Sequence, residues 1–284
     1  MTMTPELQKK VDFAIRLLRS IPTDDSPVEI SYSGGKDSDV ILELAKMAGI
    51  PYRAIYKNTT IDPPGTIAHC KANGVEIMRP QKTFFELIRE KGAPTRRARF
   101  CCEYLKEYRV LDRAVQGIRR SESVKRAKRY KEPEVCRTYP KGTKARIYLP
   151  ILEWTNEDVA QFIAERGIKC HPLYYNSGGQ FDVTKRLGCI GCPLQSQRKR
   201  RDEFKNNPKM LRLWIVNSQI FLDTHRKCAK QDYCGGSAYN LMFNELFCTS
   251  REQYLTLIEG GLFPETAIDA KKFMEDYFKI DLTL

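Results

Sequence analysis

The sequence predicts an α/β protein with a doubly wound, mostly parallel sheet and a helical C-terminal portion. Short β-rich runs alternate with helical periodicity in the N-terminal part, as expected for parallel strands joined by helices. A glycine-containing turn joins the first of these runs to the helix behind it. Beyond about residue 194 the apolar pattern is helical or irregular. We therefore expect one α/β domain over residues 1–194 and a helical region over residues 195–284.

The individual elements follow from the same periodicities. Strands are expected at residues 28–32, 52–56, 75–78, 113–118 and 146–149. Helices are expected at residues 1–20, 37–47, 67–73, 84–90, 103–111, 156–166, 208–223, 251–259 and 265–278. Thr155 is the expected N-cap of the helix that follows it. Residues 121–144 lack apolar periodicity and carry many positive charges, so we expect a mobile loop there.

The composition is that of a soluble, packed protein. The chain has 284 residues, of which 42% are hydrophobic and 29% charged. No stretch approaches the roughly 18 consecutive apolar residues that a membrane-spanning helix needs, so we expect no membrane partner. The N-terminus is amphipathic and has no small-residue cleavage site, which argues against a signal peptide. These observations predict a cytoplasmic protein.

The positive charge is concentrated in two segments. Lys and Arg number 48 against 35 Asp and Glu. Residues 91–146 hold 18 basic and 6 acidic residues, and residues 185–212 hold 9 basic and 2 acidic residues. An anionic partner follows from this surplus, and we expect the surplus to line one mouth of an anion site. Charge alone leaves nucleotide and nucleic acid open.

The strongest local signal is the segment SYSGGKDS at residues 31–38, which lies between a predicted strand and a predicted helix. Backbone N–H groups in such a turn can converge on phosphate oxygens, and the helix dipole favours the anion. The glycines allow close approach, and the lysine supplies a positive charge. The residues expected to bind phosphate are Ser33, Gly34, Gly35, Lys36, Asp37 and Ser38.

This segment resembles the PP-loop of the adenine-nucleotide α-hydrolase superfamily, and further motifs follow it in the order found in the phosphoadenosine phosphosulfate (PAPS) reductase family. Residues 58–64 (NTTIDPP) lie where that family has a D-T-G-like turn. Residues 117–123 (GIRRSES) look like its G-x-R-x-x-E-S segment, and residues 150–159 (PILEWTNEDV) are similar to its P-I-x-x-W-T-x-x-D-V helix entry. The resemblance covers about residues 25–195 and implies an adenine-nucleotide α-hydrolase-like fold.

The resemblance also implies a site and a nucleotide. Asn58 and Thr59 are expected to contact the nucleotide together with the loop. Arg119 is expected to contact an anion, since a guanidinium at a strand end presents a fork that matches phosphate or sulfate. Lys36, Asp37 and Arg119 are the expected catalytic residues, and Asp37 either supports the loop or holds a Mg²⁺ ion that accompanies ATP.

Four of the ten cysteines form two groups. Cys101 and Cys102 are adjacent, and Cys189 and Cys192 form a C-x-x-C pair. Four thiolates suit either a 4Fe-4S cluster or a tetrahedral zinc ion, and the spacing does not choose between them. The arrangement resembles that of the cluster-bearing adenosine phosphosulfate (APS) reductases, which favours 4Fe-4S. Cys228, Cys234 and Cys248 have no motif that assigns them a role.

Two reactions are open within the family. The intact SGGKDS loop is that of the ATP-cleaving relatives, which favours adenylation at the α-phosphate followed by sulfur transfer. The alternative is thiol-dependent reduction of APS or PAPS to sulfite, but the E-C-G-L-H segment that carries the attacking cysteine of those reductases is absent. The first reaction requires a sulfur donor and the second a thiol donor. The basic segments favour a third interpretation from another class, a nucleic-acid-binding thiolation component or a non-catalytic regulator.

Overall fold

The computed structural model describes residues 3–108, 111–139, 142, 144–225, 228, 233–261 and 263–283. The chain forms two compact units, each built from two segments. The first unit contains residues 1–80 and 102–188, and the second contains residues 81–101 and 189–284. The expected division has the chain pass once, near residue 194, from the α/β domain to the helical region. In the structure, residues 81–101 also belong with the C-terminal helices.

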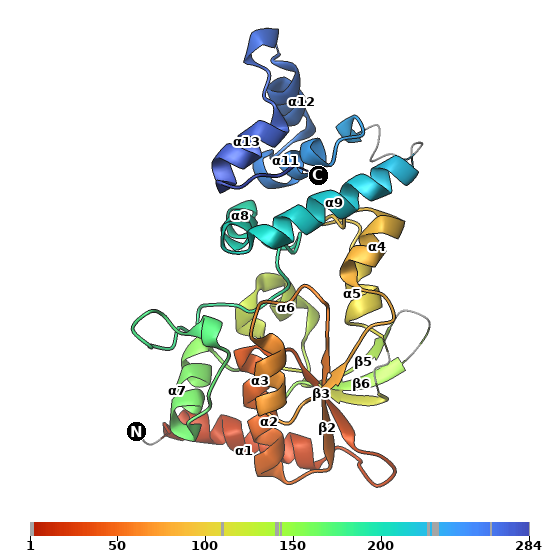
Figure 1. Cartoon of the computed structure of the whole chain (residues 1–284). Coiled ribbons are helices and arrows are strands. Elements are labelled where there is room, and N and C mark those ends of the chain that lie inside the picture. The colour runs from red at the N-terminus through yellow and green to blue at the C-terminus, as the bar shows by residue number, and fades with distance from the viewer. Residues whose placement is uncertain are drawn as a thin grey trace. The chain divides into compact units, whose positions relative to one another are not determined.

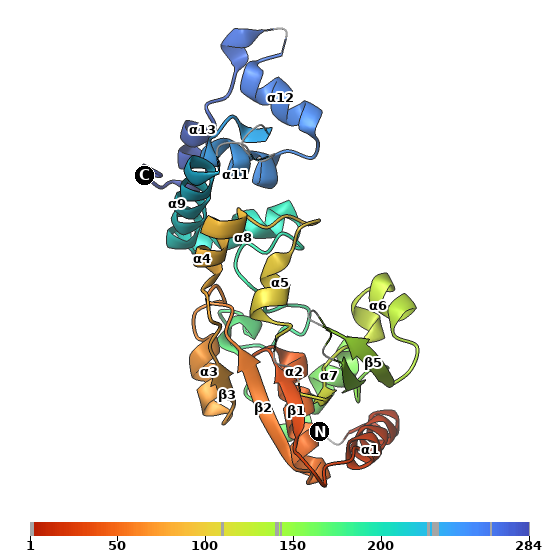
Figure 2. The ribbon, with the colours of Figure 1, turned by 90° about the vertical axis from the view of Figure 1, so that its right-hand side faces the viewer.

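The first unit is built on a six-stranded sheet with the strand order β3-β2-β1-β4-β6-β5. Five strands are parallel, and only β5 runs antiparallel to its neighbour β6. Figure 2 shows β1, β2 and β3 side by side. The strands are β1 (Val28–Tyr32), β2 (Tyr52–Lys57), β3 (Glu76–Met78), β4 (Arg113–Val115), β5 (Glu134–Thr138) and β6 (Lys144–Tyr148). The predicted α/β fold class is thereby confirmed.

Helices flank this sheet and close its main core. The helices of the unit are α1 (Pro5–Arg19), α2 (Lys36–Ala48), α3 (Thr66–Ala72), α6 (Val124–Arg129) and α7 (Asn156–Arg166), and α5 (Phe100–Leu105) spans the boundary between the units. Figure 1 shows α1, α2 and α7 on the same side of the sheet. Their apolar faces join β1 in one core, in which Trp154 meets Phe162 edge to face at 5.3 Å.

Two expectations in this unit are wrong. The predicted loop over residues 121–144 contains α6 and the edge strand β5, although residues 140, 141 and 143 lie outside the described residues. The side chains of β5 are mostly exposed, so its sequence has no apolar run that would predict a strand. The strand forms because it pairs with β6. The helix expected at residues 103–111 instead spans Phe100–Leu105, since the Lys106 and Glu107 N–H groups both turn back to the Cys102 carbonyl. Residues 109 and 110 lie outside the described part.

The second unit is helical. Its helices are α4 (Phe84–Lys91), α8 (Gln197–Asn206), α9 (Pro208–Thr224), α11 (Ala238–Phe247), α12 (Arg251–Glu259) and α13 (Ala270–Phe278), with a 3₁₀ turn at Pro264–Thr266. The buried ring of Trp214 in α9 packs against Phe84 of α4, 4.9 Å between ring centroids, and against Phe204 of α8. This contact draws residues 81–101 into the C-terminal unit. Within the described residues, no helix combines the length and apolar character needed to cross a membrane.

The cap of α7 connects that helix to α1. The Thr155 hydroxyl accepts from the Asp158 N–H at 3.2 Å, and the Asp158 carboxylate accepts from the Thr155 N–H at 2.7 Å. The same carboxylate pairs with Lys10 of α1 at 2.5 Å. The predicted N-cap Thr155 is therefore confirmed, and Asp158, its partner in the cap, also binds α1 through Lys10.

Replacing this cap tests its contribution to the first unit. Thr155→Ala removes the hydroxyl acceptor and should lower the free energy of unfolding by about 1 kcal/mol. Thr155→Ser keeps the acceptor and should lose less than half of that. Urea denaturation followed by the fluorescence of the neighbouring Trp154 measures both. Equal losses in the two variants would contradict a hydrogen-bonding role.

Candidate functional site

The phosphate-loop candidate lies where the strand order of the sheet reverses. From β1 the chain moves outward to β2 and β3, and it then returns to the other side of β1 to form β4. Parallel sheets bind ligands at such a point because the loops after the two central strands diverge and leave a crevice. Residues 33–35 directly follow β1 and lead into α2, so the loop occupies that position.

The two loop glycines are required by close packing. Gly34 has φ of +76°, and a Cβ atom there would lie 3.0 Å from Thr66 Cγ2. A Cβ atom on Gly35 would lie 3.2 Å from the hydroxyl of Tyr174. Gly35 is the N-cap of α2 and supplies no side-chain cap, and the Lys36 backbone N–H donates to the Tyr174 hydroxyl. The positive end of a helix favours an anion.

Lys36, Asp37 and Arg119 form a charged triad beneath this loop. Asp37 Oδ2 lies 3.3 Å from Lys36 Nζ, and Asp37 Oδ1 accepts from Arg119 Nε at 2.8 Å. Lys36 Nζ also donates to the carbonyl of Lys185 at 3.4 Å. Burial lowers the pKa of the Lys36 ammonium, and the Asp37 carboxylate opposes that shift. One carboxylate thus holds two cations, and the triad keeps a net positive charge.

Arg119 is fully buried, and its guanidinium binds protein groups. Beyond Asp37, it donates to Ser121 Oγ at 3.0 Å and to Asn156 Oδ1 at 3.0 Å. These bonds connect the segment after β4 with α2 and the start of α7. The geometry supports a positioning role for Arg119, and its direct contact with an anion stays a prediction.

A hollow of about 150 Å³ opens in front of the loop. Three cationic side chains, Lys36, Arg126 and Arg186, line it together with two carboxylates, Asp37 and Glu122. Glu122 pairs with Arg126 and, at 2.7 Å, with Arg186. The remaining lining residues are Ser31, Ser33, Gly35, Ser38, Gly117, Tyr174 and Leu187.

A second hollow of about 220 Å³ shares Ser31 and Ser33 with the first and extends along the ends of β1 and β2. Thr59 lines this second hollow, and its N–H donates to Asp62 Oδ2 at 3.1 Å. Asn58 is not part of the lining, and its side-chain oxygen accepts from the Thr60 N–H. Two adjoining hollows of this kind suit a ligand with a phosphate part and a larger part beside it.

Sequence reasoning did not single out Tyr174, Arg126 and Arg186 as site residues. Tyr174 is buried, its hydroxyl accepts from the Leu187 N–H at 3.3 Å, and Lys36 Nζ lies 5.4 Å from its ring centre. No local motif marks the two arginines, which reach the site only through the packing of residues distant in sequence. The basic surplus is also divided, since Arg96, Arg97 and Arg200 line a separate pocket of the second unit.

The four grouped cysteines are all partly exposed. Cys101, Cys189 and Cys192 belong to the second unit, and Cys102 belongs to the first. Cys189 and Cys192 flank a turn in which the Cys192 N–H donates to the Cys189 carbonyl at 3.2 Å. In the described part of the chain, no three or more His, Cys, Asp and Glu side chains are arranged to hold a metal ion. Their convergence on one centre stays a prediction.

The fold and the loop agree with the family match. Residues 27–195 match the phosphoadenosine phosphosulfate reductase domain family, so the chain belongs to that family. The match covers the sheet and the phosphate loop, and it identifies a nucleotide-binding enzyme family of sulfur metabolism.

Individual relatives differ in how much of the chain they share. An uncharacterized 37.8 kDa protein of Escherichia phage 186 is 34% identical over 43% of this chain and 38% of its own length. The sulfate adenylyltransferase subunit 2 of Shewanella oneidensis is 27% identical over 64% of this chain and 70% of its own. The chain spans 38–46% of the length of the first curated relatives it matches.

Among solved structures, the U34-tRNA thiolase NcsA of Methanococcus maripaludis, determined with its [4Fe-4S] cluster, matches with a TM-score of 0.39 and 16% identity. That match covers 77% of this chain and 80% of the thiolase.

Close packing of Gly117 against the loop provides a test of the site. A Cβ atom at Gly117 would lie 2.8 Å from the Asp37 carbonyl oxygen, so Gly117→Ala must displace the first turn of α2. We expect pyrophosphate affinity, measured by calorimetry, to fall about tenfold, or about 1.4 kcal/mol. Gly178→Ala is the control, because a Cβ atom there meets its nearest atom, Asn176 Oδ1, only at 3.4 Å. Unchanged affinity in Gly117→Ala would show that the loop does not bind the anion.

Proposed function

We propose that the first unit binds an adenine nucleotide with its phosphates against residues 33–38 and transfers the adenylyl group. The observation that carries the proposal is the start of α2, which has no side-chain cap from Gly35 and contributes Lys36 and Asp37 to the triad with Arg119. A helix start with backbone N–H groups and a buried positive charge suits a polyphosphate. The adjoining hollow, which Thr59 lines, would take the nucleoside part.

The proposed reaction is cleavage of ATP between the α- and β-phosphates. A substrate oxygen or sulfur attacks the α-phosphorus, a bond forms to that atom, and the bond to the bridging oxygen breaks with release of pyrophosphate. A sulfur donor then attacks the substrate atom that carries the activated oxygen, and the bond between that atom and the oxygen breaks, so that AMP leaves with the oxygen. Charge accumulates on the departing pyrophosphate, so Lys36 would stabilise the transition state more than the bound substrate.

The other two members of the triad have distinct roles in this proposal. Asp37 holds Lys36 in position through its Oδ2 atom. Arg119 orients Asp37 and adds positive charge from beneath the loop. Because both Asp37 oxygens have protein partners, Asp37 would reach a Mg²⁺ ion only by sharing one of them. Sulfate is the first acceptor to test, since one relative is named as a subunit of sulfate adenylyltransferase.

Removal of the Lys36 charge tests the adenylation proposal. Lys36→Ala should lower turnover about a hundredfold and raise the dissociation constant of ATP less than tenfold, because the charge acts on the leaving pyrophosphate. Incubation with ATP labelled at the α-phosphate, followed by chromatography, distinguishes AMP plus pyrophosphate from ADP. Lys46→Ala is the matched control, because Lys46 lies in the last turn of the same helix and is half exposed.

The same assay separates the alternatives. Release of ADP would rule out adenylation. If ATP yields no pyrophosphate with any acceptor while APS or PAPS is reduced to sulfite with a thiol donor, the thiol-dependent reduction is the correct reaction.

We also propose that Cys101, Cys102, Cys189 and Cys192 hold a 4Fe-4S cluster. The donor set fits such a group, since four thiolates are the usual ligands of a 4Fe-4S cluster and all four cysteines are partly exposed, whereas Cys70, Cys170, Cys234 and Cys248 are buried. When bound, the cluster would supply a site for sulfur or electron transfer. Zinc is the alternative occupant of the same four thiols.

Metal analysis tests this second proposal. Protein purified without oxygen should contain about four iron and four acid-labile sulfide ions per chain. Cys192→Ser should lose most of the iron, and Cys136→Ser should keep it, because Cys136 is exposed and belongs to neither group. Stoichiometric zinc would keep the ligand set and exclude the cluster. Absence of both metals would reject the site.

A further inference from the structure

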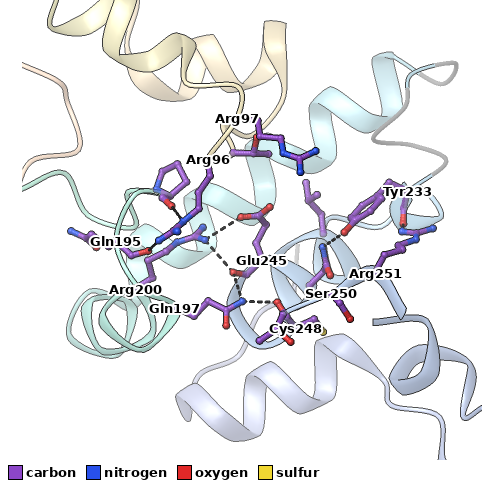
Figure 3. A pocket seen from close by; sticks show the side chains of 15 residues that line it. Arg96, Arg97, Gln195, Gln197, Arg200, Tyr233, Glu245, Cys248, Ser250 and Arg251 are labelled. Carbon is purple, nitrogen blue, oxygen red and sulfur yellow. Dashed lines mark hydrogen bonds and ion pairs between the residues drawn. The ribbon is translucent and has the colours of Figure 1, made fainter. Parts of the chain in front are cut away.

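The second unit contains a pocket that the nucleotide chemistry of the first unit does not use. It has a volume of about 900 Å³, at the upper end of the roughly 300–1,000 Å³ of small-molecule sites. Four arginines line it, Arg96, Arg97, Arg200 and Arg251, and among the described residues Glu245 is the one carboxylate of the lining (Figure 3). Four guanidinium groups in one lining indicate an anionic ligand.

Three of the arginines are held in position by protein groups. Arg96 donates to the carbonyls of residues 193–195 at 3.0–3.2 Å. Arg200 donates from Nη1 to both the carbonyl and the carboxylate of Glu245 at 3.1 Å, so this carboxylate is already paired (Figure 3). Arg251 donates to the Tyr233 carbonyl and lies 4.0 Å from the centre of the Tyr233 ring. The positive charges are therefore preorganised.

Two buried polar atoms of the lining have no hydrogen-bond partner among the described residues. They are Nε of Arg200 and Oε1 of Gln195. Arg200 is only 3% exposed, so its donor lacks compensation from bulk water. A phosphate oxygen would satisfy the Arg200 donor, and a base amino group or a ribose hydroxyl would satisfy the Gln195 acceptor. An inorganic phosphate could satisfy only the Arg200 donor.

The surroundings favour an extended polyanion over a single nucleotide. Arg200 lies on α8, whose sequence QRKRRDEFKN carries five basic and two acidic residues. The exposed Arg97 extends the positive charge to another wall of the pocket. The Arg251 guanidinium lies over the ring of Tyr233 and 5.2 Å from the centre of the Tyr254 ring, and unpaired bases stack on groups of these two kinds. A duplex presents its bases only at the groove edges and could not use this surface.

We propose that this pocket of the second unit binds a single-stranded nucleic acid through its phosphate backbone and one unstacked base. The inference does not depend on the reaction proposed for the first unit. Binding of a fluorescein-labelled 12-nucleotide strand, DNA or RNA, is measured with the full chain by fluorescence anisotropy. Affinity should fall steeply between 50 and 200 mM salt, as counterion release requires. A duplex of equal length should bind more weakly.

Charge reversal locates the binding in this pocket. The double variant Arg97→Glu/Arg251→Glu should weaken strand binding at least about tenfold and flatten the salt dependence. Arg212→Glu is the matched control, an exposed arginine of α9 that lies outside the pocket lining, and it should change affinity less than about threefold. Melting temperatures of all variants are compared with the unmodified chain, and circular dichroism checks that each one is folded.

Competition experiments test whether the pocket binds the strand itself or only a mononucleotide or pyrophosphate. Excess ATP, AMP or pyrophosphate should not displace the oligonucleotide. Displacement by ATP would place the strand at the phosphate loop and overturn the proposal. So would equal effects of the double variant and the control, preferential binding of duplex, or absence of strand binding at 50 mM salt.

Discussion

The first unit depends on one partly buried carboxylate shared between two buried cations. Asp37 lies in the first turn of α2 and binds Lys36 of its own helix and Arg119 of the segment after β4. Two buried cations without it would leave an uncompensated charge, which is strongly unfavourable. Because the two cations belong to segments on either side of the strand reversal, this interaction closes the base of the crevice in which the loop lies.

The same interaction explains why Arg119 differs from a simple anion ligand. A guanidinium has five N–H donors in one plane, and those of Arg119 serve Asp37, Ser121 and Asn156. Its charge still contributes to the field of the loop, because a buried charge is poorly screened. Lys36, Arg126 and Arg186 are the cations that line the hollow itself, two of them balanced by Glu122.

The positively charged side chains have different surroundings in the two units. In the first unit, cations line small hollows beside a helix start and are interleaved with carboxylates. In the second, four arginines and, among the described residues, one carboxylate line a larger pocket. A surplus of basic residues in the sequence cannot distinguish these cases, because screening and pairing depend on which residues become neighbours. Each unit therefore has its own candidate site for an anionic ligand.

The sequence by itself determined the features that depend on local pattern. These are the alternation of strands and helices along the chain from β1 to β4, the glycine loop before α2, and the Thr155 cap, because periodicity, backbone freedom and capping act over a few residues. The tertiary structure alone decided that β5 is a strand, that Arg126 and Arg186 reach the loop, and that residues 81–101 belong with the C-terminal helices. Each of these depends on pairing or packing between residues far apart in the chain, which leaves no local signal.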